Sequence, residues 1–199
     1  MNTKKAALII MHCQNDIVHP DGLYRHAGVY AQVEKNHTLD TIASLAQACR
    51  DAGIQVIYIN NEFKEGYPEL GPNNLPICTS SRDTHSFLTG TWGVENPDVV
   101  KPKDQDLVII NVNTSAFSYT NLDQILRAKD IRNLYLAGFA TNFVVDSTAR
   151  YGSELGYNIF VLEDCCESFT EEMHEFEIKN ILPKFGTITS SKEMLEEMK

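Results

Sequence analysis

Six short runs of consecutive apolar residues are spread along the chain, and segments with helical periodicity lie between most of them. The runs are 6–11, 54–60, 106–111, 134–138, 158–163 and the weaker 186–190. Continuous rather than alternating apolar residues are typical of strands buried on both faces, as in parallel sheets. Helices are expected over 30–53, 120–130, 141–156, 170–182 and 190–199. The alternation predicts a three-layer α/β/α sandwich around a mostly parallel sheet.

The longest stretch without a regular pattern is 61–105, which holds five of the seven Pro residues, several Gly and Asn residues, and the one tryptophan, Trp92. A long irregular segment in a compact domain is usually functional, so we expect a lid or an interface there. No repeat, linker or shift in composition divides the chain. Its 199 residues suit one domain over 1–199.

Charge and hydropathy exclude several classes of function. The formal net charge is −10 without a basic cluster, which disfavours nucleic acid as a partner. No apolar run approaches the roughly 18 residues that a membrane span needs. The N-terminal "MNTKKAALIIMHC" lacks the apolar core and cleavage site of a signal peptide. We therefore expect a cytoplasmic protein that needs no membrane.

The chain has five cysteines, Cys13, Cys49, Cys78, Cys165 and Cys166. An odd number without repeated spacing argues against a disulfide framework and for a reducing compartment. Free cysteines are commonly buried as small apolar residues, so we expect all five to be structural or incidental.

Parallel sheets bind ligands at the carboxyl ends of their strands, so the residues that leave each strand are the site candidates. Residues 12–16 leave the first strand, 111–115 the third and 138–141 the fourth. The helix expected to begin near Asn142 would present free N–H groups to an anion. Asn, Asp and Thr after strands also cap helices and close turns, so each residue alone is weak support for a site.

Five segments together resemble the isochorismatase-like cysteine hydrolases. They are "ALIIMHCQNDIV", "GTWGVENPDVV", "VIINVNTSAFSYTNLDQIL", "LYLAGFATNFVVDSTAR" and "VLEDCCES", in the family's order over roughly 6–190. The family includes isochorismatases, nicotinamidases and N-carbamoyl amidohydrolases. The resemblance implies a six-stranded, mostly parallel sheet with helices on both faces. It also implies a homodimer or homotetramer.

The resemblance also locates the family's catalytic Asp, Lys and Cys, and this chain differs at all three positions. His12 stands at the Asp position, Asn111 at the Lys position and Val144 at the nucleophile. Val has no nucleophilic atom, so covalent catalysis at residue 144 is impossible. Cys13 is expected to face away from a pocket that His12 faces, because adjacent strand residues point to opposite faces. His12 and Asn111 would form a neutral, hydrogen-bonded pair.

The resemblance further predicts a pocket for a small carboxylate or amide, and it places a cis bond of family members at Phe139–Ala140. The expected lining or binding residues beside the three triad positions are Asp16, Trp92, Phe117, Tyr119, Phe139, Ala140 and Thr141. No cofactor is expected. No metal site is expected either, because the "INNEFKEGYP" region has Glu62 but no His, and His19 and His85 are isolated.

Three hypotheses remain open. The first is a non-catalytic member that keeps the pocket as a binder or regulator. The second is a rewired hydrolase in which His12 acts as general acid or base on a carboxylate, amide or vinyl ether, with Asp16 or Asn111 orienting the imidazole. The third is a structural subunit that assembles through residues 61–105 and the helix surfaces.

Overall fold

Six parallel strands form a single sheet in the order β3-β2-β1-β4-β5-β6. The computed structural model describes residues 2–72 and 75–198, without the side chain of Cys78. The strands are β1 (Ala6–Met11), β2 (Gln55–Asn61), β3 (Leu107–Asn111), β4 (Asn133–Phe139), β5 (Asn158–Glu167) and β6 (Thr187–Thr189). Each coincides with one of the six apolar runs, so the predicted parallel sheet is confirmed.

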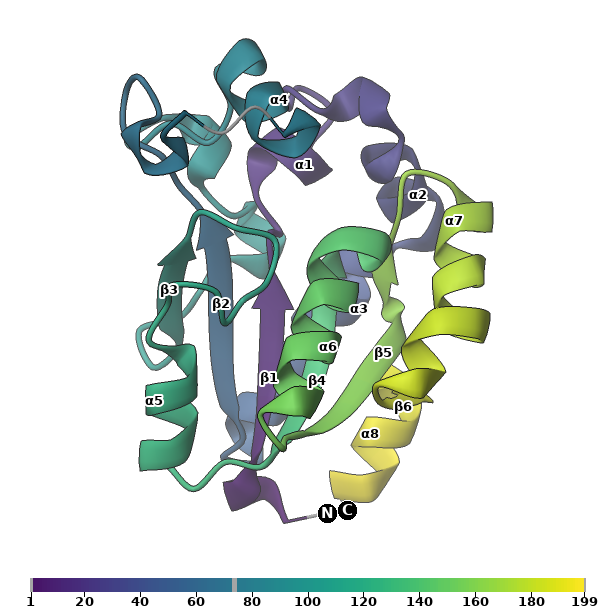
Figure 1. Cartoon of the computed structure of the whole chain (residues 1–199). Helices are drawn as coiled ribbons and strands as arrows, with labels where there is room; N and C mark the ends of the chain where they lie inside the picture. Colours follow the sequence, from purple (N-terminus) through teal and green to yellow (C-terminus); the bar gives the residue numbers. More distant parts are fainter. Residues whose placement is uncertain (1, 73–74, 199) are drawn as a thin grey trace.

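Helices cover both faces of this sheet, which confirms the three-layer sandwich (Figure 1). One face carries α2 (Val29–Asn36), α3 (Thr38–Asp51) and α8 (Ser191–Met198). The other carries α5 (Leu122–Ala128), α6 (Asp146–Glu154) and the segment that follows α7 (Glu171–Phe176). The shorter elements are α1 (Asn15–Val18), α4 (Pro76–Thr84), the π-helical Thr141–Val145 and Glu177–Ile181, and 3-10 turns at Thr3–Lys5, Arg25–Ala27, Pro68–Leu70, Trp92–Val94, Asp98–Val100 and Leu182–Lys184. No described helix has the length and apolarity needed to cross a membrane.

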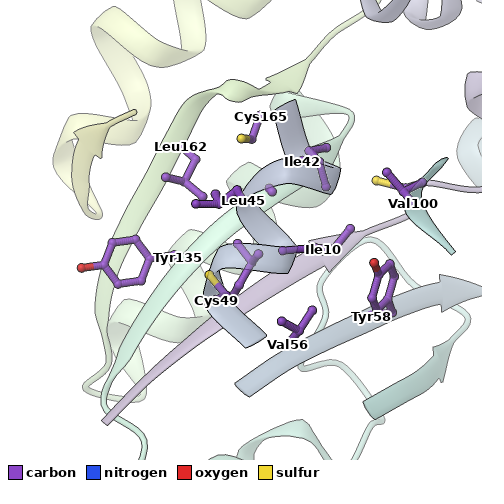
Figure 2. Packing of buried hydrophobic residues seen from close by; sticks show 14 of the residues in the cluster. Ile10, Ile42, Leu45, Cys49, Val56, Tyr58, Val100, Tyr135, Leu162 and Cys165 are labelled. Carbon is purple, nitrogen blue, oxygen red and sulfur yellow. The ribbon is translucent and has the colours of Figure 1, made fainter. Parts of the chain in front are cut away.

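The α3 face shows why the sequence folds this way. Ile42, Leu45 and Cys49 recur at helical spacing and are fully buried against Ile10 and Val56 of the sheet (Figure 2). Burial raises the pKa of the Cys49 thiol to about 12.

The other described thiols confirm the same structural role. Cys13, Cys165 and Cys166 are also free and fully buried. Four of the five cysteines are therefore packing residues, as predicted, and the side chain of Cys78 lies outside the described residues.

The helix expected over 30–53 is two helices, divided at His37, whose φ of 53° is left-handed. The break is explained by contacts with a residue that is distant in sequence. Asn36 Nδ2 and the Thr38 hydroxyl both donate to Oε1 of buried Glu167, at 2.8 and 2.9 Å. A continuous helix would turn two residues that are two positions apart toward different sides, so one of these donors would be lost.

The order of the strands alone indicates where a ligand-binding crevice lies. The chain begins at β1 in the middle of the sheet, builds outward through β2 and β3, and then crosses to β4 on the other side of β1. The crossover leaves a crevice at the carboxyl ends of β1 and β4, where open parallel sheets bind ligands. Segment α4 and the turns around it lie at the same end of the sheet (Figure 1).

Candidate functional site

A cavity of about 520 Å³ opens at the carboxyl end of the sheet. Its walls come from strand ends (His12, Asn61, Val112, Asn113, Thr114), from the β4–α6 turn (Phe139, Ala140, Phe143, Val144), and from α4 and nearby segments (Ile17, Tyr24, Phe63, Ser80, Ser81, Phe87). Ala27, Val29, Leu70, Leu75, Ile77 and Phe169 complete the lining. No Asp, Glu, Lys or Arg is among the lining residues that the structure describes. The described lining is mainly apolar, and its only acidic or basic side chain near neutral pH is the imidazole of His12.

His12 occupies the first position after β1 and turns its ring toward the end of β3. Its backbone is left-handed, with φ of 53°, which breaks the strand alternation after Met11. Its ring Nε2 lies 3.0 Å from Asn111 Oδ1, and the side chain is 3% exposed. Cys13 packs in the core cluster on the α3 face, so the predicted opposition of His12 and Cys13 is confirmed.

The hydrogen bonds of Asn111 assign the tautomer of His12. Asn111 Nδ2 donates to the carbonyls of Asn113 and Ser115, at 2.7 and 3.3 Å, so Oδ1 is the atom that faces His12. Nε2 of His12 must therefore carry the proton and donate. Burial lowers the pKa of His12 from 6.5 to about 4, against the opposing effect of the Asn111 bond. The imidazole is neutral at pH 7, and its Nδ1 is an acceptor without a partner among the described residues.

Asn61, the last residue of β2, adds a second polar group to the floor of the cavity. Its side-chain Oδ1 is buried without a hydrogen-bond partner in the described chain, and Nδ2 has none there either. Its backbone is fixed, because Asn61 N–H donates to Gln14 Oε1 at 2.7 Å and Gln14 Nε2 donates back to Asn61 O at 2.7 Å. A buried carbonyl oxygen such as Asn61 Oδ1 is costly to leave without a partner unless something else binds it.

The turn after β4 carries Val144, which is 4% exposed and lines the cavity. The Phe139–Ala140 bond is cis. Gly138 has φ of +127°, and a Cβ there would lie 2.0 Å from the carbonyl oxygen of Met11, so only glycine fits.

The expectation that this turn directs its N–H groups into the pocket needs correction. The amides of Phe143, Val144 and Val145 all donate to the carbonyl of Ala140, at 3.1, 3.0 and 3.3 Å. All three amides share this one carbonyl in a π-helical turn, so none of the three is free to donate to a ligand.

Asp16 lies outside the cavity lining and holds the loop that covers it. Its Oδ2 accepts from the Phe87 N–H at 2.8 Å, and the side chain is buried. Burial raises the pKa of the Asp16 carboxyl above its ordinary value. A Cβ on Gly93 would lie 2.4 Å from the Asp16 oxygens, which explains the glycine after Trp92.

Of the sequence-predicted residues, His12, Phe139, Ala140 and Val144 line the cavity, and Asn111 stands directly behind His12. Besides Asp16, four predicted residues lie away from the cavity, which corrects the expected lining. Trp92 is 46% exposed with its ring 4.7 Å from His19, and Tyr119 is 96% exposed. Phe117 stacks on Tyr151 and Tyr157 in the core, and Thr141 Oγ1 is hydrogen-bonded to His174 Nδ1 at 2.9 Å.

Sequence reasoning missed Asn61 and most of the cavity roof. The candidates came from residues that leave the first, third and fourth strands. Asn61 directly follows the second apolar run, 54–60, so its position was a signal of the same kind. The roof residues Tyr24, Ser80 and Ser81 had no signal, because they come together only in the tertiary structure.

The described residues contain no group of three or more His, Cys, Asp or Glu that could hold a metal ion. None of the four described thiols lines the cavity, and burial raises the pKa of Cys13 and Cys165 well above the ordinary value. No described thiolate is therefore available at this site.

Comparisons with known proteins agree with the fold. A family model described as the Isochorismatase domain matches residues 6–193. The ureidoacrylate amidohydrolase RutB of Acinetobacter baylyi is 34% identical over 200 residues, covering 94% of this chain and 81% of that protein. Its counterpart in Stutzerimonas stutzeri is 32% identical over 205 residues, covering 96% and 81%.

A solved structure is similar as well. The cysteine hydrolase from Pseudomonas syringae pv. phaseolicola has a TM-score of 0.86 at 21% identity, covering 100% of this chain and 94% of that chain. The family match takes in all six strands and the turn that carries Val144. The chain belongs to the isochorismatase family of hydrolases.

Proposed function

We propose that this chain is a small-molecule binding protein on the isochorismatase scaffold, which holds an uncharged ligand without forming a covalent bond to it. The observation that carries the proposal is the wall of the cavity, where Val144 occupies the turn after β4 and no described lining residue is a thiol. The resemblance assigns His12, Asn111 and Val144 to the triad positions, and the contact between His12 and Asn111 supports that assignment.

The hydroxyl groups of the cavity do not replace the missing nucleophile. A serine or threonine nucleophile needs a base within hydrogen-bond reach. The one described side-chain partner of His12 is Asn111, so no lining hydroxyl is paired with an imidazole. Among the described residues, the site therefore lacks the nucleophile–base pair that covalent hydrolysis requires.

The neutral floor favours an amide over a carboxylate. His12 Nδ1 offers a lone pair, which attracts an N–H donor and repels a carboxylate. The Asn61 amide can donate through Nδ2 or, after a half-turn of its side chain, accept through Oδ1. A carboxamide, with one donor and one acceptor on the same edge, complements this pair.

Hydrolysis by a rewired site is the second candidate, because two relatives at 34% and 32% identity are named amidohydrolases. The carboxylate of ureidoacrylate would have no cationic partner in the described lining of this cavity. His12 would also be a poor general acid at pH 7, because a pKa of about 4 leaves it almost entirely unprotonated. We therefore place binding before hydrolysis.

A matched ligand pair separates the two candidates. Calorimetric titration at pH 7 is expected to show binding of 3-phenylpropanamide and at least tenfold weaker binding of 3-phenylpropanoate. Ammonia release from the bound amide, followed for a day, is expected to equal the rate without protein. Val144→Phe should weaken binding by narrowing the cavity at the turn after β4, whereas Val108→Phe, on the exposed edge of β3, should not.

Two results would overturn the proposal. One is equal or tighter binding of the carboxylate. The other is protein-dependent release of ammonia from the amide, or from ureidoacrylate, that is lost in His12→Gln, because that result would make His12 a catalytic group.

A further inference from the structure

The roof of the cavity carries a cluster of hydroxyl groups that has no role in the proposed binding of an amide by His12 and Asn61. The Tyr24 hydroxyl lies 3.0 Å from Ser86 Oγ, 3.4 Å from Ser80 Oγ and Thr84 Oγ1, and 3.5 Å from Ser81 Oγ. Three of these residues, Tyr24, Ser80 and Ser81, line the cavity.

The cluster has more hydrogen-bonding capacity than it uses. One phenol hydroxyl donates one hydrogen bond and accepts about two, so it cannot satisfy four neighbours. Ser86 holds the short contact, and Thr84 has a second partner in the carbonyl of Ser80 at 2.7 Å. Ser80 and Ser81 have only their long contacts to Tyr24 among the described side-chain bonds, although Ser81 is 8% exposed.

The helix itself does not use these two serines. Thr79 and Thr84 of α4 return their hydroxyls to the helix, to the carbonyls of Pro76 and Ser80. Within the described chain, Ser80 and Ser81 make no such bond. Their hydroxyls therefore contact Tyr24 alone among the described side chains, and all three residues line the cavity.

The roof and the floor lie on different elements. Ser80 and Ser81 belong to α4, which lies beyond the carboxyl ends of β1 and β2, whereas His12 and Asn61 end those strands (Figure 1). Apolar side chains such as Phe63, Phe87 and Val112 supply most of the remaining wall. A ligand that spans the cavity would meet one polar group at each end.

We propose that Tyr24, Ser80 and Ser81 form a second polar subsite, which binds an uncharged hydroxyl or carbonyl group at the far end of the ligand. The subsite rests on the proposed binding function, because it uses the same cavity. A phosphate or carboxylate is disfavoured there, since no Lys or Arg lines the described wall. Arg82, on the same helix, donates instead to the carbonyl of Gly71.

The test compares ω-hydroxyalkanamides of four to eight carbons with alkanamides of equal length, titrated calorimetrically into the full chain. At one chain length the terminal hydroxyl is expected to tighten binding about fivefold, the effect of one net hydrogen bond. Ser80→Ala/Ser81→Ala should remove this gain, so that the hydroxyalkanamide and the alkanamide of equal length bind the variant with equal affinity, and a cooperative urea unfolding transition shows that the variant is folded. Thr79→Ala, which removes a hydroxyl of α4 that does not line the cavity, should keep the gain.

The subsite is wrong if alkanamides bind but no chain length gains from the hydroxyl, or if the gain persists in the double variant. Alkan-1-ols provide an arm without the amide. If amides fail to bind while an alkanol binds and loses affinity in the double variant, the amide-binding proposal fails and the subsite stands. If neither series binds, both proposals are overturned.

Discussion

Strand β3 is bracketed by two buried polar pairs that differ in charge. Before its first residue, Asp106 accepts two hydrogen bonds from Arg50 of α3, at 3.0 and 2.7 Å, with side chains only 1% and 6% exposed. At its last residue, Asn111 accepts one bond from His12 at 3.0 Å. The first pair is a salt bridge, and the second is neutral.

The fold can therefore bury charge where the charge is compensated. Asp106 also accepts from the Lys103 N–H at 2.8 Å, and the hydrogen bond to Asp106 raises the pKa of Arg50. The neutrality of the cavity is thus not a general property of this interior. It follows from the residues at 12 and 111, and the proposed preference for an uncharged ligand rests on it.

The largest effect on the free energy of unfolding is expected at the Arg50–Asp106 salt bridge. Asp106→Leu leaves the Arg50 guanidinium buried without its partner and should lower the free energy of unfolding by about 3–5 kcal/mol. Urea denaturation at pH 7 measures this. Arg50→Met/Asp106→Leu, which removes both charges, should recover most of the loss. Equal losses in the single and double variants would show that the pair is not the source.

The neutral pair should make stability depend on pH in a defined window. Folded His12 has a pKa of about 4 and the unfolded side chain about 6.5, so between these values the unfolded chain binds more protons. Stability from this residue is complete above pH 6.5 and is lost as pH falls through 4. At about 1.4 kcal/mol per pKa unit the loss reaches about 3 kcal/mol.

His12→Gln removes this titration, so between pH 7 and pH 4 the free energy of unfolding of the parent should fall by about 3 kcal/mol more than that of the variant. The difference between them isolates His12, because half-buried His174, whose pKa burial also lowers, titrates in both. Parallel pH profiles would mean that His12 is not held neutral by burial.

A smaller loss is expected from Asn111→Leu, because it removes the acceptor of His12 Nε2–H. An unsatisfied buried donor costs about 1–3 kcal/mol, measured by the same denaturation at pH 7. His12→Leu/Asn111→Leu should regain the part that comes from the stranded imidazole. A single variant as stable as the parent would contradict the contact.

The smallest effect on stability, under about 1 kcal/mol, is expected for Val144→Cys. Its thiol should alkylate slowly at pH 7, with a midpoint no lower than the ordinary value of about 8.5, because no cation lies in the described lining. His12→Asp/Asn111→Lys/Val144→Cys would place an ion pair like Arg50–Asp106 beside the thiol, and alkylation should then begin at lower pH. Iodoacetamide labelling read by mass spectrometry measures both, with the parent chain as background. A single variant that labels with a midpoint below pH 8 would contradict the neutral site.

The fold was predictable because its signal is local and repeated. Each buried strand is a run such as 6–11 whose residues are apolar whichever neighbour they meet. The break at His37 was not predictable, because it depends on Glu167, which is far away in sequence. Helix α4 was not predicted within 61–105, since "PICTSSRDT" contains only one large apolar residue, Ile77.

The sequence by itself determined the order of strands and helices, the residues at 12, 111 and 144, and hence the absence of a nucleophile at 144. Only the tertiary structure decided which of the expected residues share a cavity. Asp16 and Phe117 carry motif resemblance but face a loop and the core, whereas Asn61, Tyr24 and Ser81 carry none and line the wall. The reason is physical, because composition and periodicity report which residues are buried, while side-chain direction depends on backbone geometry and on partners distant in sequence.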